Sequence, residues 1–241
     1  EVLKILKGRS SHCFLFESLE SPEQWGRYTF LGFDPRLEMN CTDGIVNIKE
    51  NGYSYGASAG DPNKVIRQIL ADHKSPRLDY LPGFSGGLVG YFSYDYIKYS
   101  EPSLKLDATD REGFKDVDLM LFDKIIAFDN FKQKIILMVN IPMNRLEESY
   151  GQGCETLEKM VDMVENCLGL DPPAGMLSSP FRPLFSKEAY CNMVERAKGY
   201  IREGDIFQVV LSNRFEADFQ GSLFHTYRIL RTTNPSPYMF Y

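Results

Sequence analysis

A carboxylate and a hydroxyl stand next to each other where an apolar run near the start of the chain ends, in the segment Leu15-Phe16-Glu17-Ser18. Such a pair can form the rim of a small-molecule pocket, in which Glu17 pairs with an ammonium group and Ser18 donates or accepts a hydrogen bond. Polar residues at the end of a strand are also common as plain surface. From these residues alone both interpretations stay open.

A second candidate is Gln208, which lies inside the apolar run of residues 206–211. Burying a neutral amide without hydrogen-bond partners is costly. Gln208 therefore either faces solvent on an alternating strand or lines a polar cavity. Alternation places it on the same face as Ile206 and Val210, which favours the cavity.

The segment Asn234-Pro235-Ser236-Pro237 is a third candidate, because its two prolines impose an extended and rigid turn. Such a turn presents Tyr238 and Met239 in a fixed direction. The sequence leaves open whether that direction serves packing or binding.

Other patterns exclude several kinds of site. The glycines of residues 82–95 accompany neither a Walker lysine nor a GxGxxG motif, so we expect close packing of aromatic side chains and backbone rather than a phosphate loop. The five cysteines and three histidines show no metal-binding spacing, and no metal site is expected in this chain. An odd cysteine count in a chain of this length argues against a disulfide framework and favours a cytoplasmic protein.

The composition, with 43% apolar and 25% charged residues among 241, is ordinary for a globular protein. The net charge of -6 argues against a nucleic-acid partner, which would need a clustered basic face. No run approaches the eighteen or so apolar residues that span a membrane, so no membrane association is expected.

The candidate residues have to be positioned by a mixture of strands and helices. Antiparallel strands are predicted at residues 13–16, 27–33 and 45–49, with turn signals at Asp43-Gly44 and Asn51-Gly52.

Helices and further strands follow. Asp61 and Pro62 suit the N-cap and first position of a helix, and residues 119–128 and 134–141 predict two strands joined near Asp129. A long helix is expected next. Its predicted apolar face consists of Leu146, Tyr150, Cys154, Leu157, Val161, Val164 and Leu168.

Residues 169–183, rich in proline and small residues, predict a linker between a domain of residues 1–175 and the start of another at 183–241. Past it, Ser186 caps a helix that ends at Gly204. A strand is expected at 205–215, a helix at 222–231 and a strand at 237–241. Because a terminal strand with nothing after it is a poor end for a domain, we expect the chain to be a fragment.

Five segments in this order resemble the large component of anthranilate synthase, a chorismate-utilising enzyme of tryptophan synthesis. They are LFES at 15–18, GRYTFLGFDP at 26–35, PGFSGGLVGYFSYD at 82–95, DIFQVVLSNRF at 205–215 and LRTTNPSPYMFY at 230–241. The resemblance covers essentially the whole chain and corresponds to the N-terminal portion of that component.

The resemblance implies a mixed α/β fold, in which two sheets form a sandwich with helices packed between them. It also implies a site for chorismate and Mg²⁺ that is built largely by the C-terminal half of such enzymes. The magnesium ligands are then expected beyond Tyr241, and this chain alone is expected to lack most of the active site and to be inactive.

The resemblance further implies a feedback site for L-tryptophan. A carboxylate suits the ligand ammonium, and tyrosine and methionine suit an indole. Phe16 stands where the family motif has leucine, a conservative change. The residues carried over to this site are Leu15, Glu17, Ser18, Asn234, Pro237, Tyr238 and Met239.

Gln208 matches a position that faces the nucleophile in the family's active site. Relatives that add water to chorismate carry a lysine base there, whereas glutamine can only orient ammonia. The implied lyase reaction adds ammonia from a glutamine amidotransferase partner to chorismate and releases pyruvate to give anthranilate. The alternatives are the large component of aminodeoxychorismate synthase, which serves folate synthesis, and a non-catalytic amino-acid-binding module.

Overall fold

The computed structural model describes residues 1–21, 23, 26–101, 103–104, 110 and 112–241, and it forms two compact units. The first unit consists of Glu1–Asp171 together with Arg231–Tyr241, and the second is Pro172–Leu230. The last residues of the chain therefore belong with its first ones. The domain limits expected at residues 175 and 183 stay a prediction.

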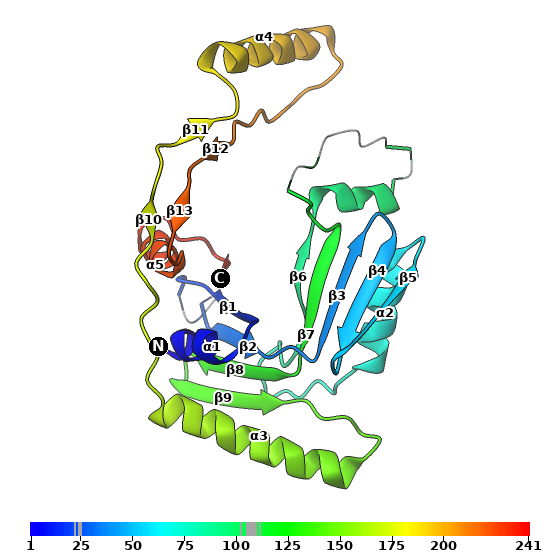
Figure 1. Cartoon of the computed structure of the whole chain (residues 1–241), viewed down its shortest axis with the longest axis vertical. Helices are drawn as coiled ribbons and strands as arrows, with labels where there is room; N and C mark the ends of the chain where they lie inside the picture. Colours follow the sequence, from blue (N-terminus) through cyan, green and yellow to red (C-terminus); the bar gives the residue numbers. More distant parts are fainter. Residues whose placement is uncertain (22, 24–25, 102, 105–109, 111) are drawn as a thin grey trace. The chain divides into compact units, whose positions relative to one another are not determined.

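The first unit contains two five-stranded sheets, and neighbouring strands in both are antiparallel (Figure 1). The first sheet has the order β14-β1-β2-β8-β9. Its strands are β1 Cys13–Glu17, β2 Tyr28–Phe33, β8 Lys124–Asp129, β9 Lys134–Val139 and β14 Met239–Phe240.

The second sheet has the order β5-β4-β3-β7-β6. Its strands are β3 Leu37–Thr42, β4 Ile45–Glu50, β5 Tyr53–Ser58, β6 Gly87–Phe92 and β7 Val117–Phe122. Both predicted turns are confirmed, because Asp43-Gly44 and Asn51-Gly52 have positive φ at both positions, as tight hairpins require. The mixed α/β class with antiparallel sheets is likewise confirmed.

The strand predicted over residues 119–128 is wrong, because the chain changes sheets at Asp123. β7, a strand of the second sheet, ends at Phe122, and β8, a strand of the first sheet, begins at Lys124. Residues on both sides of the corner are buried, including Leu121, Phe122 and Ile125. A corner between two buried strands leaves no polar interruption long enough to reveal it in the sequence.

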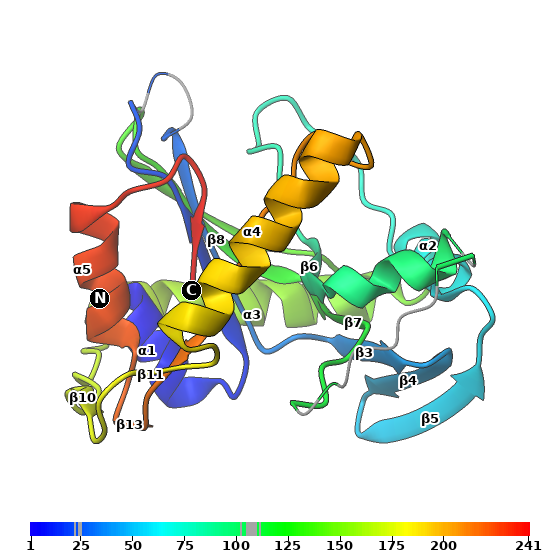
Figure 2. The same ribbon diagram turned by 90° about the horizontal axis from the view of Figure 1, so that it is seen from above.

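Three α-helices and a 3-10 helix pack on these sheets: α1 Val2–Arg9, α2 Pro62–Asp72, η1 Tyr94–Tyr99 and α3 Leu146–Asn166. The predicted cap of α2 is confirmed, since the Asp61 side chain accepts a hydrogen bond from the Asn63 amide. Figure 2 shows α2 beside β3 and β4, where Ile66 and Ile69 join a buried cluster with Met39 and Leu119. α3 lies along β9 (Figure 1).

The apolar face predicted for α3 is wrong in part: Cys154, Leu157 and Val164 are half-buried, but the other four predicted residues are exposed. Its buried residues are Ser149, Gly153, Met160 and Met163, whereas the predicted Leu168 is 95% exposed and lies beyond the helix. A Cβ on Gly153 would lie 2.9 Å from Cγ2 of Ile141. Small residues therefore face the sheet because they allow close approach, which a hydrophobic pattern does not reveal.

The second unit is built from two short strand pairs and helices. β10 Met176–Leu177 pairs with β13 Phe219–Gln220, and β11 Arg182–Pro183 pairs with β12 Phe215–Glu216. α4 is Lys187–Glu203, and its predicted caps are confirmed: Ser186 accepts from the Ala189 amide, and Gly204 is left-handed. α5, Phe224–Thr233, begins in this unit, and its last residues, from Arg231, belong to the first unit.

The strand predicted at 205–215 is wrong for most of its length. Residues 206–214 have no regular secondary structure, and only Phe215 enters a strand. A strand needs a hydrogen-bonded neighbour, and within the described residues 206–214 belong to no ladder. The β-branched residues of this segment favour an extended conformation, but among the described residues no neighbouring strand pairs with them.

Candidate functional site

The two ends of the chain meet in the first sheet, where β1 pairs with β14. Phe16 lies opposite Phe240 and Glu17 lies opposite Met239. The Leu15 amide donates to the Tyr241 carbonyl at 2.9 Å, and the Tyr241 amide donates back to Leu15 at 3.0 Å. The segments expected to frame a ligand site are thus neighbours in space.

The pairing divides the side chains of this site between two faces of the sheet. Residues directly opposite each other share a face, so Glu17 and Met239 lie on one face and Phe16 and Phe240 on the other. Met239 is 7% exposed, whereas Phe240 is 75% exposed. Where β1 meets β14, the first face is the more buried of the two and carries the carboxylate.

The Glu17 carboxylate forms an ion pair with Arg231. Nε of Arg231 lies 2.9 Å from Oε2 of Glu17, and the Glu17 side chain is only 8% exposed. Arg231 lies in the last turn of α5, and its side chain is 39% exposed. A carboxylate so far removed from water needs a cation beside it, and this chain supplies one.

Sequence reasoning missed Arg231 as a member of this site. The residue belongs to the segment LRTTNPSPYMFY, only three positions before Asn234. The available signal was that a buried glutamate requires a countercharge. With twenty-seven lysines and arginines in the chain, that signal could not select one of them.

The other predicted residues surround this pair. Ser18 directly follows β1, and its hydroxyl accepts a hydrogen bond from the Glu20 amide at 3.1 Å. Asn234 and Pro237 are exposed in the turn between α5 and β14, and Tyr238 is 70% exposed just before Met239. Leu15, on the same strand as Glu17, is buried.

Gln208 lies in the second unit, in the irregular segment 206–214, and is exposed. Neither the solvent-facing strand nor the polar cavity of the sequence analysis describes it, because no strand forms there. Its role stays a prediction.

A hollow of about 430 Å³ opens beside the start of β1. Phe14, Met120 and Phe122 supply apolar walls, and Cys13 and Tyr241 lie at its margin. Burial raises the pKa of the Cys13 thiol, despite the opposing effect of nearby Lys7. The thiol is therefore protonated at neutral pH, and the hollow offers an apolar surface next to the β1–β14 pair rather than a nucleophile.

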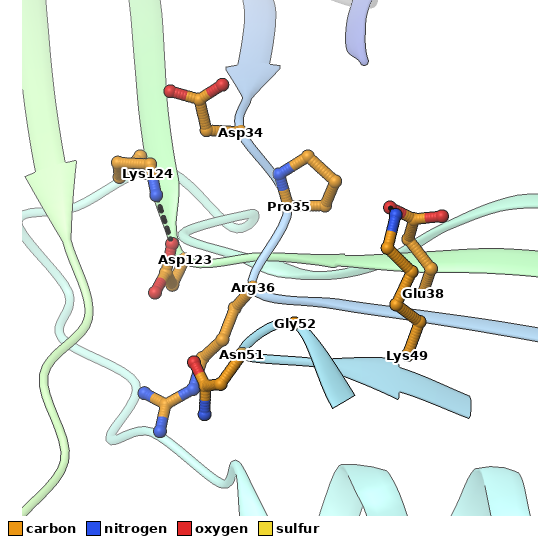
Figure 3. Close-up of a pocket in the computed structure, with 9 residues that line it drawn as sticks. All are labelled: Asp34, Pro35, Arg36, Glu38, Lys49, Asn51, Gly52, Asp123 and Lys124. Atoms are coloured by element: carbon orange, nitrogen blue, oxygen red, sulfur yellow. Dashed lines mark hydrogen bonds and ion pairs between the residues drawn. The ribbon is translucent and has the colours of Figure 1, made fainter. Parts of the chain in front are cut away.

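A second hollow, of about 530 Å³, lies where the chain crosses between the sheets (Figure 3). Its walls come from the β2–β3 connection, the β4–β5 turn and the β7–β8 corner. Two of its cations are paired with lining carboxylates: Lys124 with Asp123 at 3.1 Å, and Lys49 with Glu38 at 3.1 Å. Because no aromatic side chain lines it, this hollow is a poor match for an aromatic ligand.

A structural ion pair fixes the β8–β9 hairpin. Asp129 is 2% exposed and receives hydrogen bonds from Arg27 Nη2 at 3.1 Å and from the Lys132 amide at 2.9 Å. Burial raises the pKa of the Asp129 carboxyl, but these donors outweigh it and hold the pKa below its ordinary value. Asp129 thus remains ionised and locks the hairpin.

Among the described residues, no three histidine, cysteine, aspartate or glutamate side chains gather as a metal site would require. No helix in the described part of the chain is both long and apolar enough to cross a membrane.

The fold and the motifs on it define a class of protein. Residues 12–241 match the chorismate binding enzyme family, and the chain belongs to that family. The chain is 36% identical over 240 residues to anthranilate synthase component 1 of Acetivibrio thermocellus, covering 96% of this chain and 48% of that protein. It is 36% identical to the chloroplastic anthranilate synthase alpha subunit 2 of Arabidopsis thaliana, covering 97% of this chain and 41% of that protein.

A solved structure agrees with these relatives. The crystal structure of anthranilate synthase component I from Streptococcus pneumoniae TIGR4 superposes with a TM-score of 0.65 at 30% identity, covering 90% of this chain and 47% of that one. The resemblance inferred from the motifs is therefore confirmed. The chain spans about half the length of the relatives it matches.

Proposed function

We propose that this chain serves in the large component of an anthranilate synthase and carries the site at which L-tryptophan inhibits it. Family membership and the anthranilate synthase relatives support the reaction class. The pairing of β1 with β14 is the observation that carries the inhibitor site, because it places Glu17 opposite Met239. A cytoplasmic location fits the reduced cysteines expected from the sequence.

In the proposed reaction, ammonia from a glutamine amidotransferase partner adds at C2 of chorismate as the C4 hydroxyl leaves as water. Loss of pyruvate then gives anthranilate. Gln208 would orient the ammonia, because its amide oxygen accepts an N–H hydrogen bond but cannot take up a proton at neutral pH.

Magnesium is the metal that the family implies. The residues described here do not fit it, because they bring no three acidic or histidine side chains together. We therefore assign no step of the reaction to a metal held by the described residues of this chain.

In the proposed inhibitor site, tryptophan lies at the ends of β1 and β14. The Glu17 carboxylate suits its ammonium group, and Met239 with Tyr238 suits its indole. Ser18, immediately after Glu17, supplies a hydroxyl, and the turn with Asn234 and Pro237 holds Tyr238 in place.

The proposal is tested by a thermal-shift titration of this chain with L-tryptophan, with L-phenylalanine as the control ligand. A ligand at a hundred times its dissociation constant adds about 2.7 kcal/mol to the free energy of unfolding. Tyr238→Ala should weaken the tryptophan response. Tyr55→Ala, which removes a 56% exposed tyrosine from β5, should leave the response unchanged.

The reaction is tested separately by following anthranilate fluorescence with chorismate and ammonia as substrates. Formation of anthranilate that tryptophan suppresses supports both parts of the proposal. Binding of tryptophan by a protein that never forms anthranilate, with its partner and magnesium supplied, would favour a non-catalytic amino-acid-binding module.

A further inference from the structure

We propose that an amino-acid zwitterion enters the site by exchanging with the Glu17–Arg231 ion pair. Its ammonium group replaces Arg231 beside Glu17, and its carboxylate pairs with the released guanidinium. The inference rests on the proposed inhibitor site and assigns Arg231 as the residue that makes this site selective for α-amino acids.

The Glu17 carboxylate already has a cation beside it. Nε of Arg231 lies 2.9 Å from Oε2 of Glu17, and the Nε atom itself is buried. A ligand ammonium therefore meets a carboxylate whose charge is already compensated. It gains little unless it takes the position of the guanidinium.

Separating Glu17 from Arg231 leaves two charges that each need a new partner. The Glu17 side chain is 8% exposed, so it cannot exchange one cation for water without a large loss. An amine without a carboxylate would satisfy Glu17 but leave the guanidinium, which is 39% exposed, without its anion. A zwitterion brings one charge for each partner and leaves neither unpaired.

The guanidinium of Arg231 is suited to bind the ligand's carboxylate. Arginine presents five N–H donors in a planar fork that matches a carboxylate in a bidentate manner. Arg231 belongs to the last turn of α5, directly before the turn that leads into β14. Its guanidinium and Met239 thus approach Glu17 from the same segment of chain, so charge recognition and an apolar surface lie together.

Isothermal titration with two ligands tests the exchange: L-tryptophan and tryptamine, which has the indole and the ammonium but no carboxylate. The wild-type chain should bind tryptophan at least about tenfold more tightly than tryptamine, as expected for a charge-assisted carboxylate contact. In Arg231→Gln this preference should fall below about threefold. Tryptamine should bind the variant more tightly than the wild type, because Arg231 no longer competes for the Glu17 carboxylate.

The ratio of two affinities within one variant is insensitive to a loss of stability, which makes it a better measure than tryptophan affinity alone. Glu17→Gln/Arg231→Gln provides a second variant if the loss of Arg231 beside a buried Glu17 prevents folding, since two amides can bond to each other. It should lose the preference as well. Arg202→Gln, an exposed arginine on α4, is the matched control and should keep the wild-type ratio.

The outcomes separate the two proposals. If the wild type binds tryptophan but prefers it no more than tryptamine, or if Arg231→Gln keeps the tenfold preference, the exchange is refuted while the inhibitor site stands. If the wild type binds neither ligand, the inhibitor site itself is refuted and the exchange fails with it.

Discussion

Replacing Met239 by alanine should loosen the β1–β14 pair, and the structure gives the size of the effect. Met239 is 7% exposed, and the substitution removes about three buried side-chain atoms. At about 0.8 kcal/mol for each methylene-sized group, the loss is about 2 kcal/mol. This is the low end for buried methionine, as expected where a two-residue strand can relax around the vacated space.

Hydrogen exchange at the Leu15 and Tyr241 amides measures this loss directly, since both amides donate across the β1–β14 pair. When reclosing is faster than exchange, a change of about 2 kcal/mol corresponds to about thirtyfold faster exchange at these two positions. Global melting is a weaker measure, because the chain has two compact units that need not unfold together.

The neighbouring residue supplies the matched control. Phe240→Ala alters the same strand at a side chain that is 75% exposed, and it should change the exchange of both amides by less than about threefold. Equal acceleration in the two variants would refute the assignment of Met239 to the buried face. No acceleration in either would refute the pairing as the element that protects these amides.

Two further substitutions test the frame that holds the site. Asp129→Asn should lower the free energy of unfolding in urea by about 1–3 kcal/mol at neutral pH, because Arg27 loses its charged partner. Because the pKa of Asp129 is lowered in the folded state, the stability difference between wild type and variant is fully present above the ordinary pKa of about 3.9. It shrinks as the pH falls through the folded pKa. A stability difference that does not change with pH would contradict the ion pair. Gly90→Ala should cost about 3 kcal/mol in the same assay, because its Cβ would lie 1.9 Å from the Asp118 carbonyl oxygen. Gly199→Ala is the control, because its Cβ would meet nothing within 4 Å; it should leave the free energy of unfolding unchanged or raise it by at most about 1 kcal/mol. A similar loss of stability in both glycine variants would argue against the close approach of β6 and β7.

Local signals in the sequence were sufficient for much of the fold. Tight turns and helix caps depend on neighbouring residues, so Asp61, Ser186 and Gly204 could be assigned without knowledge of the tertiary structure. Features that depend on distant parts of the chain could not be assigned from the sequence. The corner at Asp123 and the burial of Gly153 on α3 are decided by which sheet the chain joins and how closely elements approach.

The candidate site divides in the same way. Motif resemblance pointed to Leu15, Glu17 and Met239, and the structure places them together. The motifs could not reveal the role of Arg231, because its ion pair with Glu17 joins two distant segments and neither segment alone predicts it.

The location of this site at a strand pair between opposite ends of the chain has an energetic consequence. Closing so long a stretch of chain costs entropy, and a two-residue strand returns few hydrogen bonds for it. Burial of Met239, at about 2 kcal/mol, and the Glu17–Arg231 ion pair must therefore carry much of the stability of β14. A ligand at a hundred times its dissociation constant contributes about 2.7 kcal/mol, which is as large as the contribution of Met239. A ligand bound at this pair would thus change the stability of β14 by as much as the burial of Met239 does, so a modest affinity suffices there to control whether β14 stays paired with β1.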